Sequence, residues 1–165
     1  MKKKYIISMI LLVLTCIFVQ PTFAEDAKTL SGSACKPLDS NAEVIIDLWG
    51  RMYNDSTSPQ DWSCIFPRDV MAAATEGIAY GNVKFIDNNP TASGWCYLLS
   101  EPSTGYTGHA AFRETTVAQA SSSPVTLSYP SLYAYSWGFY HYWCKIPGKY
   151  GTQRSGIVSY SITEN

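Results

Sequence analysis

The stretch Tyr-Ala-Tyr-Ser-Trp-Gly-Phe-Tyr-His-Tyr-Trp-Cys-Lys-Ile-Pro, residues 133–147, is the densest aromatic run of this chain. It lacks helix-capping residues and a 3.6-residue period, and aromatic residues favour a pleated, half-buried surface, so it predicts a long strand. From residue 139 onward, alternation puts two sets on opposite faces: Tyr140, Tyr142, Cys144 and Ile146 on one, and Phe139, His141, Trp143 and Lys145 on the other. The strand should end at Pro147, which cannot donate a backbone hydrogen bond.

Seven further segments predict short strands: residues 43–49, 62–66, 78–86, 94–99, 109–117, 125–129 and 156–162. They are rich in β-branched or aromatic residues and are bounded by turn residues. A helix capped by Asn41 is an alternative for the first, and a bend is expected at Gly81-Asn82. Residues 70–77 have helical composition, enough for one or two turns. About eight strands without intervening helices predict an all-β fold, an antiparallel two-sheet β-sandwich that is jelly-roll-like.

The first 24 residues have the pattern of an export signal. Lys2, Lys3 and Lys4 precede an apolar run over residues 5–19, and Thr22-Phe23-Ala24 suits a signal peptidase. The run is shorter than the roughly 20 residues of a membrane span, which disfavours an uncleaved anchor. We expect a signal peptide over 1–24, an N-terminal arm over 25–41 and a β-sandwich domain over 42–165. The protein should be secreted or periplasmic in a bacterium, with no membrane span after cleavage.

Charge excludes one class of partner. Three of the 12 Lys and Arg residues leave with the signal, so the mature chain has nine basic and 13 acidic side chains, a net charge of −4. No basic patch is visible, and nucleic acid is therefore not an expected partner.

Four cysteines remain in the mature chain, and an even number in an exported protein predicts two disulfides. The alternative, a metal site, would need a Cys-x-x-Cys pair or a histidine at ligand spacing from a cysteine, and the sequence has neither. We therefore expect no metal and no other cofactor. Jelly-roll connections would put Cys144 between the strands of Cys64 and Cys96, in one sheet with His109. That order favours Cys35–Cys64 with Cys96–Cys144, and the alternative is Cys64–Cys144 with Cys35–Cys96.

The surroundings of three cysteines and the last strand form four short motifs: Cys64-Ile65-Phe66-Pro67-Arg68-Asp69, Trp95-Cys96-Tyr97-Leu98, Tyr142-Trp143-Cys144-Lys145-Ile146-Pro147 and Gly156-Ile157-Val158-Ser159-Tyr160. Together they resemble a loose class of small exported bacterial β-sandwich proteins with four cysteines. This chain has Ile65 where that class has proline. The class has no assigned activity, so the resemblance implies fold and export only.

Residues for catalysis are few. His109 and His141 are the only histidines, and His109 lies near Ser100, Ser103 and Glu114 without a Gly-x-Ser-x-Gly elbow. Asp87-Asn88-Asn89 lacks the spaced carboxylates of a calcium loop. The acids available for a catalytic pair suit turns and surfaces equally well: Asp47, Asp61, Asp69, Asp87, Glu101 and Glu114. We therefore predict that the protein is not an enzyme.

The clearest functional feature is aromatic. If Cys96 and Cys144 face the core from adjacent strands, the outer face carries Trp95, Tyr97, His141 and Trp143. Such rings can stack on sugars, or they can be covered by the arm or a loop. The main hypothesis is a structural or protein-interaction module whose partner is an extracellular protein. The alternative is a carbohydrate-binding module that uses this face for a glycan, and a hydrolase comes third.

Overall fold

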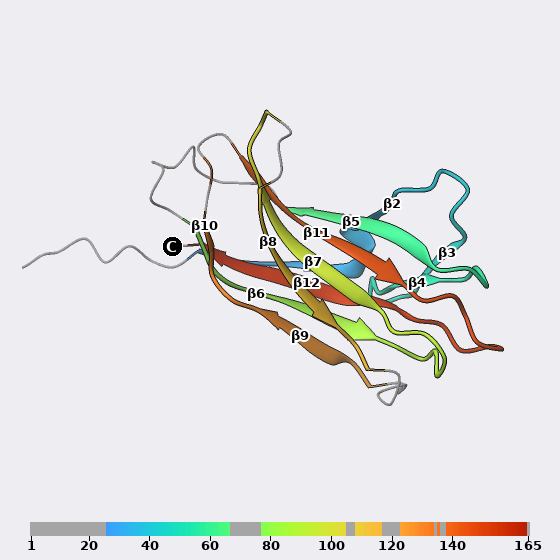
Figure 1. The fold of residues 1–165 in the computed structure, drawn as a ribbon. Coiled ribbons are helices and arrows are strands. Elements are labelled where there is room, and N and C mark those ends of the chain that lie inside the picture. Colours follow the sequence, from blue (N-terminus) through green and yellow to red (C-terminus); the bar gives the residue numbers. More distant parts are fainter. Residues whose placement is uncertain are drawn as a thin grey trace, which may run out of the picture.

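The computed structural model describes residues 26–66, 77–104, 108–116, 123–133, 135 and 138–164. Its strands form two antiparallel sheets stacked face to face (Figure 1). The predicted antiparallel β-sandwich is confirmed. The predicted signal peptide and residues 70–76 of the predicted helical turn lie outside the described residues. No helix within the described ranges has the length and apolarity that a membrane crossing requires.

One sheet has five strands. Three of them carry Cys64, Cys96 and Cys144, and a fourth begins directly after Cys35. In spatial order they are β2 (Lys36–Pro37), β5 (Gln60–Phe66), β11 (Phe139–Ile146), β7 (Trp95–Glu101) and β8 (His109–Glu114). Cys144 therefore lies on the strand between those of Cys64 and Cys96, with His109 at the edge, as the jelly-roll argument predicts.

The other sheet has seven strands. A path of five runs in the order β10 (Leu132–Tyr133), β6 (Gly77–Ile86), β12 (Gly156–Glu164), β4 (Met52–Asn54) and β3 (Val44–Ile46). The remaining two are β1 (Asp26–Ser31), which pairs with β12, and β9 (Val125–Tyr129), which pairs with β6. Pro130 ends β9, so β9 and β10 follow each other along the same edge of β6.

Residues 26–37 of the segment expected as an N-terminal arm take part in the sheets. All six residues of β1 pair with β12, and β2 pairs with β5, so this segment contributes to both sheets. A short 3₁₀ helix, η1 (Gly32–Ala34), joins the two strands. The segment is polar and shows no clear alternation. It can still form a strand, because strand pairing uses backbone N–H and C=O groups, which do not depend on the side chain.

The long aromatic stretch does not form one strand. Tyr133 pairs with Gly77 of β6 in the seven-stranded sheet, whereas Phe139 pairs with Glu101 of β7 in the five-stranded sheet. The chain must therefore cross from one layer to the other between them, and Gly138 N–H donates to the carbonyl of Tyr135 at this crossing. From Phe139 to Ile146 the predicted alternation of buried and outward residues holds.

The strand predicted over residues 43–49 is shorter and is followed by a strand that the sequence did not reveal. Asp47 ends β3, because its carboxylate accepts backbone hydrogen bonds from Trp49 and Arg51. Gly50 completes the turn with φ +73°, and β4 then pairs with β3. Two- and three-residue strands of this kind bring the total to twelve in the described chain, against the eight expected.

The bend expected at Gly81-Asn82 is absent, and both residues pair regularly with β12 and β9. The irregularities lie elsewhere, between Ile157 and Ser159 and between Thr163 and Glu164. The first of them turns Ile157 into the core, and Val158 is only partly buried.

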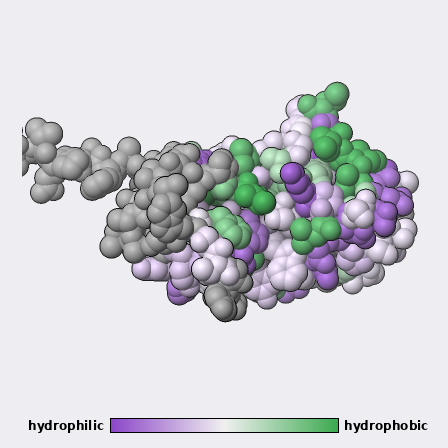
Figure 2. All heavy atoms as spheres, turned by 90° about the horizontal axis from the view of Figure 1, so that it is seen from above, coloured by the Kyte–Doolittle hydropathy of each residue, from purple (hydrophilic) through white to green (hydrophobic). Residues whose placement is uncertain are grey.

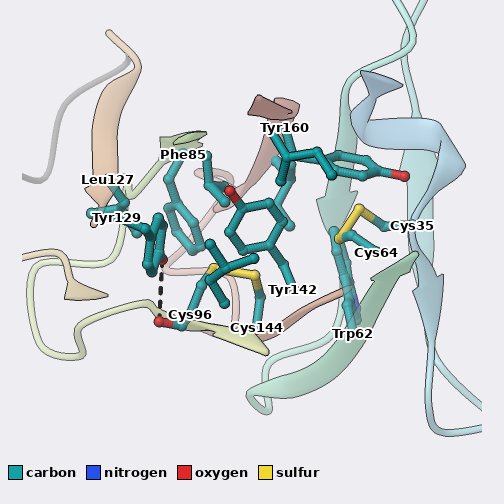
Figure 3. Close-up of a cluster of buried hydrophobic side chains, with 14 of the residues drawn as sticks. Cys35, Trp62, Cys64, Phe85, Cys96, Leu127, Tyr129, Tyr142, Cys144 and Tyr160 are labelled. Carbon is teal, nitrogen blue, oxygen red and sulfur yellow. Dashed lines mark hydrogen bonds between the residues drawn. A yellow bond between two sulfur atoms is a disulfide. The ribbon is translucent and has the colours of Figure 1, made fainter. Parts of the chain in front are cut away.

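The core between the layers is rich in rings (Figure 3). Phe66 packs edge-on against Tyr160, with ring centroids 4.8 Å apart, and against Tyr142 at 5.8 Å. Hydroxyl groups cross from one sheet to the other: Tyr142 donates to the Ser161 carbonyl at 2.9 Å and Tyr129 to the Cys96 carbonyl at 3.1 Å. These bonds satisfy polar atoms that burial removes from water.

The two predicted disulfides lie in this core. Cys35 is bonded to Cys64, and Cys96 to Cys144, and all four residues are buried. Cys96 and Cys144 occupy directly opposite positions on β7 and β11. The first bond anchors the N-terminal segment to β5, and the second joins two neighbouring strands of the five-stranded sheet.

Candidate functional site: an aromatic face on the five-stranded sheet

The outer surface of the five-stranded sheet carries rings from three neighbouring strands. Trp143 on β11 is directly opposite Tyr97 on β7, and Tyr97 is directly opposite Phe112 on β8. Trp95 lies two residues before Tyr97, on the same face of β7. Strands lie about 4.8 Å apart, so residues in one row must be close together. We call the outward set the aromatic face; its members are Trp95, Tyr97, Phe112, Phe139, His141 and Trp143.

The rings of the aromatic face are in contact with one another. Tyr97 is central: its centroid lies 4.9 Å from Phe112, 5.5 Å from Trp95 and 6.0 Å from Trp143. Trp95 meets Trp143 edge-on at 5.6 Å. Further along β11, Phe139 and His141 stack with centroids 5.5 Å apart. Mutual packing of this kind limits side-chain motion, so the face is preformed.

Part of each outer ring remains accessible to solvent. Exposed fractions are 41% for Phe112, 39% for Phe139 and 38% for Trp143, while Trp95 and Tyr97 are partly buried among them. Strands β1 and β2 of the N-terminal segment pair within the sheets and are therefore not laid across the face.

Charged and polar groups border the rings. Lys145 lies opposite Trp95, with its ammonium nitrogen 5.6 Å from the ring centroid, and it reaches Asp61 at 3.7 Å. Glu114 is the neighbour of Trp95 on the other side. Burial lowers the pKa of His141, against the opposing charge of Glu101, so its imidazole is neutral at pH 7. The face therefore combines an apolar centre with polar groups at its margin.

The structure brings together all four residues that the sequence predicts for this surface, Trp95, Tyr97, His141 and Trp143. Their role in binding a ligand stays a prediction. The predicted site did not include Phe112 or Phe139. Alternation in residues 109–114 is weak, and only the register with β7 shows that Phe112 joins Tyr97. Phe139 was already placed on the face of His141 and Trp143 by alternation along one strand, and only its membership of the site was not predicted.

The residues considered for hydrolysis are not arranged for it. Ser100 and His109 are cross-strand neighbours, but the Ser100 hydroxyl has no hydrogen-bond partner in the described chain. The His109 ring instead stacks on Tyr135, with centroids 5.4 Å apart. Glu114 lies at the opposite end of β8 from His109. Among these described residues, His109 therefore does not form the hydrogen bond to a serine hydroxyl that a general base makes to its nucleophile.

Three of the acidic side chains considered earlier, those of Asp87, Asp47 and Asp61, have partners in the structure. Asp87 is 1% exposed, and its carboxylate accepts hydrogen bonds from the hydroxyls of Thr115 and Ser155 and from the backbone of Asn89 and Gly94. Asp47 pairs with Arg51, and Asp61 approaches Lys145. Asp69 lies outside the described residues. Within the described ranges, no cluster of three His, Cys, Asp or Glu side chains could hold a metal ion.

Comparison with solved structures places this fold among β-sandwich domains. The chain is similar to the low-affinity xylan-binding module CBM86 from Roseburia intestinalis, with a TM-score of 0.50 and 11% sequence identity over 85% of this chain and 96% of that one. It is also similar to the CBM36-1 domain of a multidomain xylanase from the hindgut metagenome of Trinervitermes trinervoides, with a TM-score of 0.48 and 11% identity over 83% and 96% of the two chains.

A third similar structure is a family two carbohydrate esterase from Cellvibrio japonicus, with a TM-score of 0.48 and 8% identity over 86% of this chain. This chain spans 35% of the esterase's length. No model of a known protein family matches the chain, and no curated protein matches it either. At such low identities, the likeness supports the β-sandwich fold alone.

Proposed function

We propose that this protein is an exported, non-catalytic carbohydrate-binding module whose binding surface is the aromatic face. The observation that carries the proposal is the row of Phe112, Tyr97 and Trp143, three rings from adjacent strands that are packed together and partly exposed. Monomeric proteins seldom expose such a cluster unless it meets a partner.

The chemistry of the face suits a sugar. A pyranose ring has apolar C–H faces and an edge of hydroxyl groups, so it pairs with an aromatic centre and a polar margin. Lys145, Asp61 and Glu114 provide charged donors and acceptors beside Trp95. The fold shared with a xylan-binding module supports this reading, and two buried disulfides suit a protein that works outside the cytoplasm.

A glycan array followed by calorimetry tests the proposal, using protein purified after export. Trp143→Ala should weaken binding about tenfold or more, because it removes stacking and exposed contact area from one side of the face. Tyr80→Ala is a matched control, since Tyr80 is an aromatic residue that is 47% exposed on β6 of the other sheet. An array without binding, or equal affinities for Trp143→Ala and the wild type, would refute the proposal.

A second candidate function, a protein-interaction module, is favoured by the open edge of the seven-stranded sheet. β3 ends the path of strands, and the exposed fraction of Ile46 is 54%, of Trp49 76% and of Leu48 99%. Figure 2 shows hydrophobic atoms gathered at the end of the molecule where Figure 1 places β3. Pairing of two copies about Ile45 would oppose Glu43 to Asp47, so a second copy fits poorly.

The partner best suited to this edge is an extended apolar segment with basic flanks, which would add a strand to β3. Selection of displayed peptides against the purified protein tests this function. Peptides that bind the wild type and lose binding to Ile46→Lys would support it. If the selected peptides bind both proteins equally, or if no peptide binds the wild type, the edge of β3 is not the binding site.

A further inference from the structure

A groove of about 340 Å³ lies at one end of the seven-stranded sheet, on the layer opposite to the aromatic face. Ile45 of β3 and Tyr53 of β4 are a cross-strand pair on its floor. Asn88, which follows β6, lines one part of the groove. Residues 152–154, in the loop between β11 and β12, form its wall. The volume is within the range of small-molecule sites.

The floor follows from local packing. Met52 and Asn54 are buried, so Tyr53 between them points outward. Its neighbour in the next strand is Gly156, where an added Cβ would lie 2.9 Å from the Cδ1 atom of Tyr53. The tyrosine ring therefore lies against the glycine backbone, and a larger residue at position 156 would displace it.

The wall is held in place by hydrogen bonds. Nε of Arg154 donates to the carboxylate of Asp55 at 2.6 Å, and this bond lowers the pKa of Asp55, which keeps the pair ionised at neutral pH. The side-chain amide of Asn88 donates to the Arg154 carbonyl at 2.8 Å. The backbone of Gln153 pairs with that of Tyr150 at 3.0 and 3.1 Å.

The floor is equally well supported from the β3–β4 turn. Asp47 accepts from the Arg51 side chain at 2.5 Å, and the Arg51 guanidinium lies 4.7 Å from the Trp49 ring centroid and 5.8 Å from that of Tyr53. Groups that are already ordered lose little entropy when a ligand binds.

The groove offers hydrogen-bonding groups without excess charge. Its two charged lining residues, Asp47 and Arg154, have opposite signs. No side-chain hydrogen bond engages Gln153 or Thr152 in the described part of the chain, so an amide and a hydroxyl remain for a ligand. An apolar floor with uncharged donors and acceptors around it favours a neutral ligand that has both C–H faces and hydroxyl groups.

We propose that this groove is a second saccharide-binding site, which takes a short stretch of neutral pyranose units on the Tyr53 floor. The side chains of Gln153 and Thr152 bind its hydroxyl groups. The groove and the aromatic face belong to different layers, so the protein can hold two polysaccharide chains at once. On a surface that carries many such chains, binding at one site raises the effective affinity of the other. The groove binds by its own residues, so its test is independent of the aromatic face.

Nuclear magnetic resonance titration of the disulfide-bonded protein with xylohexaose, and separately with cellohexaose, tests this inference. The readouts are the side-chain amide signals of Asn88 and Gln153 and the backbone signals of residues 152–154. Signals of Tyr97 and Trp143 report on the aromatic face in the same spectra. The variants are Trp143→Ala, Gln153→Ala and, as a control on an exposed part of the same sheet, Thr126→Ala.

At millimolar ligand, we expect the groove signals to shift in wild type and in Trp143→Ala alike. Gln153→Ala should weaken saccharide binding in the groove about tenfold, through one lost hydrogen bond, and should not change the affinity of the aromatic face. Thr126→Ala should bind as the wild type does at both sites. Groove signals that do not move with either saccharide would overturn the inference, even if Tyr97 and Trp143 respond. Groove shifts that vanish in Trp143→Ala would also overturn it, because they would report binding at the aromatic face.

Discussion

The two layers approach each other closely at Gly81, and a larger residue there should destabilise the fold. Gly81 lies on β6, and an added Cβ would clash with the Tyr142 hydroxyl and lie 2.9 Å from Cδ2 of Leu98. Both partners are fully buried on the opposite sheet. Gly81→Ala should therefore destabilise the fold by about 2–3 kcal/mol, since a methyl group forced into a packed core displaces its neighbours.

The clash with the Tyr142 hydroxyl can be removed separately. Tyr142→Phe alone loses the hydrogen bond to the Ser161 carbonyl and should cost about 1 kcal/mol. In the double variant the methyl group can occupy the space that the hydroxyl leaves, so the two losses should fall short of additivity by about 1–2 kcal/mol. Leu98 remains close, so the relief should be incomplete.

Urea unfolding of the oxidised proteins measures these free energies from four matched curves. Gly151→Ala is the control: its φ is +62° and nothing lies within 4 Å of an added Cβ. It should cost about 1 kcal/mol through backbone strain alone and should add to Tyr142→Phe without coupling. A Gly81→Ala variant within about 0.5 kcal/mol of wild type, or strict additivity with Tyr142→Phe, would refute the packing described for the two layers.

Replacing Cys96 and Cys144 by alanine should lower the free energy of unfolding by about 4 kcal/mol, slightly more than replacing Cys35 and Cys64. The Cys96–Cys144 bond spans 48 residues and the Cys35–Cys64 bond 29, so the first closes the larger loop in the unfolded chain. Thermal unfolding of both double variants checks this order. Burial raises the pKa of Tyr160 to about 12 and also raises that of Tyr142 and Tyr129, so these groups stay neutral in the folded protein when the unfolded chain ionises. Stability should therefore be retained below about pH 10 and fall as the pH rises from there through the folded pKa values, and constant urea midpoints between pH 8 and pH 11 would contradict this. Thr115→Val should cost about 1–3 kcal/mol, because it removes a donor to the buried Asp87 carboxylate; an unchanged urea midpoint would show that the carboxylate does not depend on this hydroxyl.

Several features could be predicted from local patterns because they depend on a two-residue period. Alternation in residues 94–99 and 139–146 placed Cys96 and Cys144 inward and Trp95, Tyr97 and Trp143 outward, and the structure agrees. Turn residues such as Pro130 and Pro147 marked where strands end. Export chemistry and an even cysteine count predicted two disulfides, which the structure contains.

Other features could not be predicted, because nothing in a short window encodes them. β1 is polar and is held by backbone pairing with β12, more than a hundred residues later. β4 has three residues, too few for a period. Before Phe139 the chain crosses from one layer to the other, and the place of this crossing depends on which strands are free to pair. The residues before and after the crossing are similarly aromatic, so composition does not reveal it.

What the sequence by itself determined is the class of molecule: alternating ring-rich segments between turns can bury one face each, and two such sheets must then cover each other. What only the tertiary structure decided is which side chains meet. Phe112 joins Tyr97 through the register of β8 on β7, and the groove gathers Ile45, Tyr53, Asn88 and Gln153 from four separate segments. The physical reason is that side-chain direction follows from local alternation, whereas neighbours across strands and loops depend on pairing, and pairing is decided by the packing of the whole chain.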